Sequence, residues 1–157
     1  MSIPFHHSVA QIVQSLIVTN GLGANYVAGM SGTPTDWSVY ASGEPPQPEN
    51  CITVYGTAPK MFGKTAIDGM QQQHRGVTIR VRGVDEPTAF VRAELLMQSL
   101  TENVYRQTVE LTYQSVVYKY LVNSFPSLAL VPFGYLSPTD KRYVINLNGT
   151  VVVRTRV

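Results

Sequence analysis

Apolar residues recur at helical spacing in two segments of the chain. The first segment begins after Ser8, a good helix cap, and its apolar positions lie three or four residues apart as far as Asn20-Gly21, which is expected to end the helix. The second begins after Asp85, with Pro87 in the first turn, where a missing amide does no harm. Its apolar seam is expected to comprise Phe90, Ala93, Met97, Leu100 and Val104, widened by Val91, Leu95 and Leu96. We therefore predict two amphipathic helices.

A two-residue alternation of apolar and polar positions predicts strands in much of the remaining chain. In residues 76–82, the apolar side chains Val77, Ile79 and Val81 share one side and Thr78, Arg80 and Arg82 share the other. Further short strands are expected in runs rich in β-branched and aromatic residues, namely 37–41, 51–55, 108–113, 116–122, 142–147 and 150–156. Asn148-Gly149 is expected to form a hairpin turn, with a bulge in one long strand as the alternative.

Three segments are expected to lack regular structure. Residues 42–50 contain three prolines, which exclude a helix or a central strand. Residues 57–75 form the longest stretch without periodicity and are a candidate contact arm. Residues 123–141 contain prolines and a glycine typical of turns. Together, these patterns predict a single domain over residues 1–157 that combines two main helices with several strands.

The composition argues against several classes of function. Charged residues make up only 14% of the chain, below the roughly 25% usual for a soluble domain. The net charge of +2 is spread without runs, which disfavours tight nucleic-acid binding by a monomer. A weakly charged exterior suits a subunit that buries its faces against copies of itself, although an ordinary monomer can share this property.

No residue pattern indicates a metal, disulfide or membrane-spanning site. Cys51 is the single cysteine and is expected to be a small buried hydrophobe, while His6, His7 and His74 lack metal-ligand spacing and are expected to be surface polar residues. No apolar run approaches the roughly 18 residues needed to span a bilayer, and the first residues lack the basic region of a signal peptide. We expect a protein that stays in the cytoplasm where it is made.

Gly63-Lys64-Thr65 imitates the end of a phosphate-binding loop. That motif needs a glycine where Ala58 stands, and no strong helical pattern follows. We therefore expect no nucleotide or other cofactor and no enzymatic activity. A small nucleotide-dependent enzyme built on these residues is kept as a distant alternative.

Basic residues are the candidates for contacts between subunits. Arg80, Arg82, Arg154 and Arg156 are expected to point outward from two strands, either as one basic patch or, as we favour, in ion pairs between subunits. The full set of interface candidates is Lys60, Phe62, Lys64, Arg75, Arg80, Arg82, Arg154 and Arg156.

The order of several segments resembles a known family. These segments are the first helix up to Asn20, the lead Glu44-Pro-Pro-Gln-Pro-Glu-Asn into Cys51-Ile-Thr-Val-Tyr55, Val77-Thr-Ile-Arg-Val-Arg-Gly83 before the second helix, and Asp140-Lys-Arg-Tyr-Val-Ile-Asn146 after Pro132. Over nearly the whole chain, this order is similar to that of the tail terminator, or minor tail and neck, proteins of long-tailed bacteriophages.

The resemblance implies an α+β fold that is sandwich-like, with a central mixed or antiparallel sheet flanked by two main helices. It also implies a virion structural protein that assembles as a six-membered ring. Such a ring caps the tail tube, ends its polymerisation and offers a joining surface to the head–tail connector or stopper protein, while DNA crosses the opening without sequence-specific binding. It implies no catalytic residue, metal or cofactor, and a location in the tail or neck after assembly in the host cytoplasm. Residues 57–75 are our candidate for the contact with the tail tube protein. A neighbouring neck component, such as a head-completion stopper, is the alternative.

Overall fold

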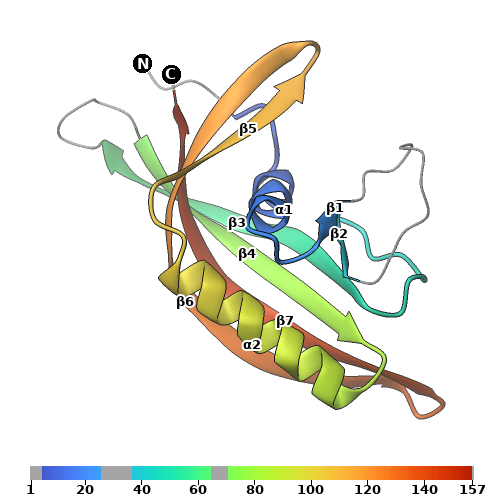
Figure 1. Ribbon diagram of the computed structural model, residues 1–157. Coiled ribbons are helices and arrows are strands. Elements are labelled where there is room, and N and C mark those ends of the chain that lie inside the picture. The colour runs from blue at the N-terminus through green and yellow to red at the C-terminus, as the bar shows by residue number, and fades with distance from the viewer. Residues whose placement is uncertain (1–4, 26–36, 65–70, 157) are drawn as a thin grey trace.

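One mixed sheet organises the molecule (Figure 1). In the computed structural model, which describes residues 5–25, 37–64 and 71–156, seven strands pair in the order β1-β2-β3-β4-β7-β6-β5. The elements in chain order are α1 (Val9–Thr19), β1 (Ala24–Asn25), β2 (Ser38–Ala41), β3 (Cys51–Lys64), β4 (Gln71–Gly83), α2 (Glu86–Glu102), β5 (Gln107–Tyr113), β6 (Val116–Ser137) and β7 (Asp140–Arg156). β1, β2 and β3 run parallel, whereas every other pair in the described sheet is antiparallel. The predicted α+β class and mixed sheet are confirmed.

The first helix forms as its sequence predicts. The Ser8 hydroxyl accepts from the Gln11 amide at 3.2 Å, and the Gln11 side chain accepts from the Ser8 amide at 2.9 Å, which completes a capping box. The helix ends at Asn20, followed by Gly21 at a φ of 71°. Its apolar face is buried through Val9, Ala10, Ile12, Val13, Leu16 and Ile17.

The second helix starts where expected but turns a different face to the sheet. Asp85 accepts from the Thr88 amide at 2.9 Å and caps the helix. The buried positions of α2 are Ala89, Ala93, Leu96 and Leu100. The predicted seam is wrong at three positions, since Phe90 is 47% exposed, Val91 67% and Leu95 43%. A Cβ at Gly83 would overlap Ala89, so the missing side chain there lets the alanine row lie close against the sheet.

Both helices cover the same face of the sheet, so the expectation of a sheet flanked by two main helices fits only loosely. The buried apolar residues of α1 and α2 join one core cluster with inward-facing residues of β3, β4 and β7. Within it, Val54, Ile79 and Leu147 occupy adjacent register positions on three neighbouring strands. Each such side chain contributes roughly 1.5–3 kcal/mol by burial. Figure 1 shows the sheet curling around the helices. We call its other side the helix-free face.

The predicted irregular segment 57–75 is instead largely a hairpin. β3 continues to Lys64 and pairs with β4 from Gln71 onward, with register shifts between Gly56 and Pro59 and between Met61 and Lys64. The backbone pairing satisfies the amide and carbonyl groups here, whereas the sequence lacks alternation, so periodicity could not reveal the strands. Residues 65–70 lie outside the described part of the chain.

The C-terminal half is built from two long strands, and this corrects two further predictions. β6 passes through Pro126 and Pro132, in the segment that was predicted to be turns. β5 pairs only with the first part of β6, so the rest of β6 forms an edge of the described sheet. An edge strand tolerates prolines because their missing amide donors face no partner strand. β7 passes through Asn148-Gly149 without a hairpin turn or a register shift there. A Cβ at Gly149 would overlap the Ser127 carbonyl, so glycine permits the close approach of β6 to β7.

Candidate interaction surfaces

A row of unlike side chains crosses the helix-free face. In register across five strands stand Tyr40 on β2, Thr53 on β3, Arg80 on β4, Asn146 on β7 and Val131 on β6. In the adjoining row, the Thr78 hydroxyl donates to Asn148 Oδ1 at 3.0 Å. The helix-free face is therefore polar at its centre, where the opposite face is apolar.

Glu44 holds two arginines at one end of this face. Its carboxylate lies 3.5 Å from Arg80 Nε and 3.4 Å from Arg82 Nη1, as ion pairs without hydrogen-bond geometry. Arg82 also donates to the Pro48 carbonyl at 2.7 Å and to the Glu49 carbonyl at 3.3 Å, and only 3% of the residue is exposed. The expectation that Arg82 points outward to pair with another subunit is wrong, because its donors are used within the chain.

A second arginine anchors the same proline-rich segment. Arg142 donates to the Pro46 carbonyl at 2.9 Å and to Asp140 Oδ2 at 2.6 Å. These hydrogen bonds from Arg142 hold the pKa of Asp140 down, at about 2. Residues 42–50 are thus fastened over the end of the helix-free face by Arg82 and Arg142.

Cys51 is the register partner of Arg82, on the helix-free face, and is 1% exposed, which confirms the prediction that it is a small buried hydrophobe. Burial raises the pKa of its thiol to about 11, and the nearby charge of Arg82 opposes the shift. At neutral pH the thiol is therefore protonated and a poor nucleophile.

Two exposed apolar residues lie at the β6 end of the row that runs from Tyr40 to Val131. Phe133 is 62% exposed and Val131 is 42% exposed. The Arg80 guanidinium carbon lies 5.3 Å from the centre of the Phe133 ring, within the range of a cation–π contact. We call Arg80, Val131 and Phe133 the sheet anchor.

The outer side of α2 carries a second exposed apolar group, made of Phe90, Val91 and Leu95. Val91 is 67% exposed and borders a shallow cavity of about 380 Å³ that Trp37 and Arg92 also line. Arg92 stacks 4.6 Å from the Trp37 ring and donates to the Leu22 carbonyl at 3.1 Å, which ties α2 to the chain after α1. We call Phe90, Val91 and Leu95 the helix strip.

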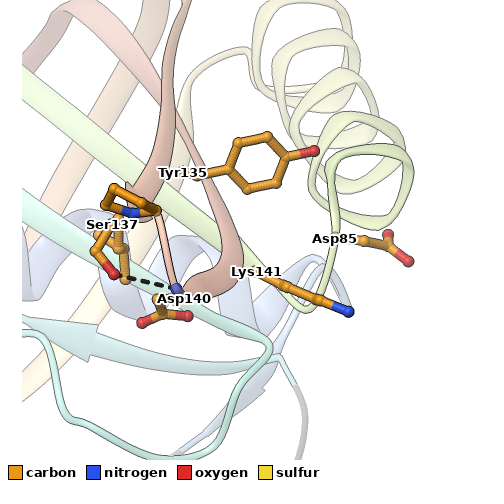
Figure 2. A pocket seen from close by; sticks show the side chains of 7 residues that line it. Asp85, Tyr135, Ser137, Asp140 and Lys141 are labelled. Atoms are coloured by element: carbon orange, nitrogen blue, oxygen red, sulfur yellow. Dashed lines mark hydrogen bonds between the residues drawn. The ribbon is translucent and has the colours of Figure 1, made fainter.

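A larger cavity of about 770 Å³ lies at the tip of the β6–β7 hairpin, beside the start of α2 (Figure 2). Tyr135 lies between the hairpin tip and the first turn of the helix, and its ring meets that of Tyr143 edge-on at 5.0 Å. Asp140 donates its amide to the Ser137 hydroxyl at 3.1 Å, which closes the turn. Asp85 and Lys141 complete the lining with opposite charges.

The two adjacent histidines are packed against the β5–β6 hairpin. His6 stacks on Tyr118 with ring centres 4.2 Å apart, and His7 Nδ1 lies 2.8 Å from the Tyr120 hydroxyl. His6 is exposed, as predicted, and His7 is half-buried, and both contact tyrosines of β6. Within the described residues no group of histidine, cysteine and acidic side chains is placed to hold a metal ion.

The remaining predicted interface residues do not gather in one place. Arg75 lies on the helix side, 4.7 Å from the Phe5 ring. Arg154 lies eight residues beyond Asn146 on β7, about 26 Å at 3.3 Å per residue, so it forms no single patch with Arg80. Lys60, Phe62 and Lys64 lie on β3 and Arg156 on β7, and their side chains are outside the described part of the structure.

Glu44, Phe133 and Val91 were missed as functional candidates. Glu44 stands in a proline-rich segment with no periodicity, and Phe133 in a segment predicted to be turns. Val91 was assigned to the buried side of the helix. The one signal in the sequence was that α2 has more apolar positions than a single buried stripe requires.

No family model matches this chain, and no curated protein shows significant sequence similarity to it. Neither helix in the described residues is long and apolar enough to cross a membrane. Gly63-Lys64 belongs to β3, whereas a phosphate-binding loop lies between a strand and a helix N-terminus.

Proposed function

We propose that this chain is a structural subunit of a bacteriophage virion, which forms a ring on the end of the tail tube, stops tube polymerisation and presents a joining surface to the head. DNA passes through the ring without sequence-specific contacts. The sequence resemblance described above suggests this family. The exposed surfaces of the folded chain support the same proposal.

The observation that carries the proposal is the placement of the exposed apolar side chains. Large apolar residues are exposed on the outer side of α2, on the helix-free face, at the β5–β6 hairpin and at the β6–β7 hairpin. In one list, they are Val84, Phe90, Val91, Leu95, Tyr105, Tyr113, Val116, Val117, Val131, Phe133 and Tyr135. Exposed patches of this kind mark interaction sites, and a subunit between two neighbours, a tube and a connector needs several of them.

The long hairpins are suited to the axial contacts of such a ring. β3 with β4 and β6 with β7 pair along most of their lengths, beyond the part that the helices cover. A hairpin can present side chains at a distance from the core while the backbone groups between its two strands stay hydrogen-bonded to each other. The β3–β4 hairpin, which includes part of the predicted contact arm, remains our candidate for the surface that meets the tail tube protein.

Tail length measures the proposed function directly. The experiment deletes the gene for this chain from the phage that encodes it and images the particles by electron microscopy. Overlong tubes without heads are the expected result, and the gene supplied in trans restores normal length. Tails of normal length with heads that lose their DNA would instead assign the chain to the stopper position, and normal particles would overturn both assignments.

A further inference from the structure

The outer edge of β6 is left without a partner strand beyond β5. β5 pairs with β6 as far as Val122, and the Asn123 carbonyl then accepts from the Arg106 amide at 2.9 Å. From residue 124 to residue 137, β6 pairs only with β7 within the described part of the chain. An unpaired strand edge presents a row of backbone amides and carbonyls on which another strand can form.

This edge lacks the charged side chains that usually prevent pairing between open edges. No charged residue lies between Lys119 and Asp140. Pro126 and Pro132, with a register shift beside each, limit the length over which another strand can pair. Between the two prolines, residues 127–131 keep an unbroken register with β7. We call residues 127–131 the edge window, since they remain regular, uncharged and open to a partner strand.

The backbone groups that point outward from the edge window follow from the position of Pro132. Opposite residues in an antiparallel pair alternate between exchanging both backbone hydrogen bonds and exchanging none. Pro132, the register partner of Ile145, has no amide and therefore belongs to the second kind. Leu130 and Leu128 belong to the same kind, so their amides and carbonyls point away from β7. Their side chains pack against the core, so at the edge they offer their backbone.

The edge window is symmetric, and its symmetry selects the partner. Pro126 and Pro132 each stand three residues from Ala129. In two antiparallel copies with Ala129 opposite Ala129, each Leu128 stands opposite Leu130 of the other copy, and their outward amides and carbonyls match. Pro126 then stands opposite Pro132, and neither residue has an amide that needs an acceptor. The edge window is therefore complementary to a second copy of itself.

We propose that two free copies of this chain pair through the edge window about a two-fold axis at Ala129, which joins their sheets into one. The contact uses the same surface of both copies and therefore closes at a dimer. It is a state of the free chain and does not rest on the proposed function. The outer side of β3 offers no comparable window, because register shifts interrupt it between Gly56 and Pro59 and again between Met61 and Lys64.

The exposed Ala129 side chain gives a test that is specific to this register. Ala129→Lys and Ala129→Asp each place two like charges across the two-fold axis, and each variant should dimerise at least about 10-fold more weakly than wild type. An equimolar mixture should form a mixed pair at least about 10-fold more tightly than either variant alone, because opposite charges then meet. Sedimentation equilibrium up to about 1 mM measures the association.

Val117 provides the matched controls for these charges. It is 54% exposed on the part of β6 that pairs with β5, so Val117→Lys and Val117→Asp should dimerise like wild type. Circular dichroism checks that all variants are folded.

A second pair of variants tests the outward backbone itself. Leu130→Pro removes one outward amide, whereas Leu130→Ala shortens the side chain and keeps the amide, so the proline variant should dimerise at least about 10-fold more weakly than the alanine variant. In the wild-type chain, hydrogen exchange at the Leu128 and Leu130 amides should slow as the concentration rises. Exchange at the Ala129 and Val131 amides, which point towards β7, should stay constant.

Three results would overturn this contact. They are a wild-type chain that stays monomeric up to about 1 mM, an Ala129→Lys variant that associates like wild type, and a mixture that associates no more tightly than its two components. Concentration-dependent protection confined to other amides would also exclude the edge window. None of these results changes tail length, so the proposed function would stand if this contact failed. Normal particles from the gene deletion would remove the proposed function and leave this contact untouched.

Discussion

The two faces of the sheet use their side chains in opposite ways. The face beneath the helices is filled by apolar residues such as Ile79 and Leu147, which are fully buried. The helix-free face, on the same strands, carries Arg80 and Asn146 between these residues and holds its charges through Glu44. One alternating pattern therefore makes a stable core on one side and a surface available for contacts on the other.

The sharpest way to break this comparison is to replace one aliphatic side chain on each face with alanine. Leu147→Ala empties a site between Ile79 and Leu130 and should lower the free energy of unfolding by about 3–4 kcal/mol. Val131→Ala, at a 42% exposed position, should cost less than about 1 kcal/mol. Urea denaturation of both variants measures the two changes in the free energy of unfolding. Changes of similar size would show that the two faces are packed equally tightly.

A second pair of variants compares a buried charge with an exposed one on the helix-free face. Arg82→Met removes one of the two ion pairs of Glu44 and leaves the carbonyls of Pro48 and Glu49 without their donor, which should cost about 2–4 kcal/mol. Lys119→Met breaks only an exposed pair with Glu110 and should cost less than about 0.5 kcal/mol. If the two losses in denaturant unfolding were equal, Arg82 would not anchor the proline-rich segment.

Acid should loosen the same segment through Asp140. Its pKa is lowered from 3.8 to about 2 in the folded chain, so its contribution to stability is complete above the unfolded value and is lost as the pH falls towards 2. Asp140→Asn should therefore melt below wild type at pH 6, and the difference should shrink between pH 4 and pH 2. Arg142→Met should show the same trend, and a difference that is constant with pH would contradict the Asp140–Arg142 pair.

The last comparison concerns the protection of one thiol. With a pKa of about 11 instead of 9.0, Cys51 should react with a disulfide reagent at pH 8 at least about 100-fold more slowly in the folded chain than in the unfolded chain. Arg82→Met should speed labelling relative to Lys119→Met, because it releases the segment that covers this end of the sheet. Equal labelling rates in these two variants would show that the segment held by Arg82 does not shield Cys51.

Local signals predicted much of the fold. The caps Ser8 and Asp85 and the alternation around Ile79 each depend on residues close in sequence, and each prediction is confirmed. Segments 57–75 and 123–141 were misjudged because neither shows a regular two-residue alternation and both contain prolines. Their pairing is decided by the neighbouring strand, which the local sequence does not reveal.

The candidate surfaces were harder to predict because tertiary contacts decide them. The alternation predicts that Arg82 points outward from its strand. It is buried because Glu44 and Pro48, which are distant in sequence, fold over it. The helical spacing predicts that Phe90 is a core residue of α2. It is exposed because α2 packs against the sheet through Ala89, which lies close to Gly83. Alternation predicted the side of the sheet on which Arg80 lies, but not its contact with Phe133.

The most direct test of the account is to image tail-tube ends after incubation with the purified chain. The account predicts a closed ring of this protein at one end of each tube, after which tube subunits no longer add there. Bare ends that keep growing, or chains bound along the sides of the tube, would contradict it.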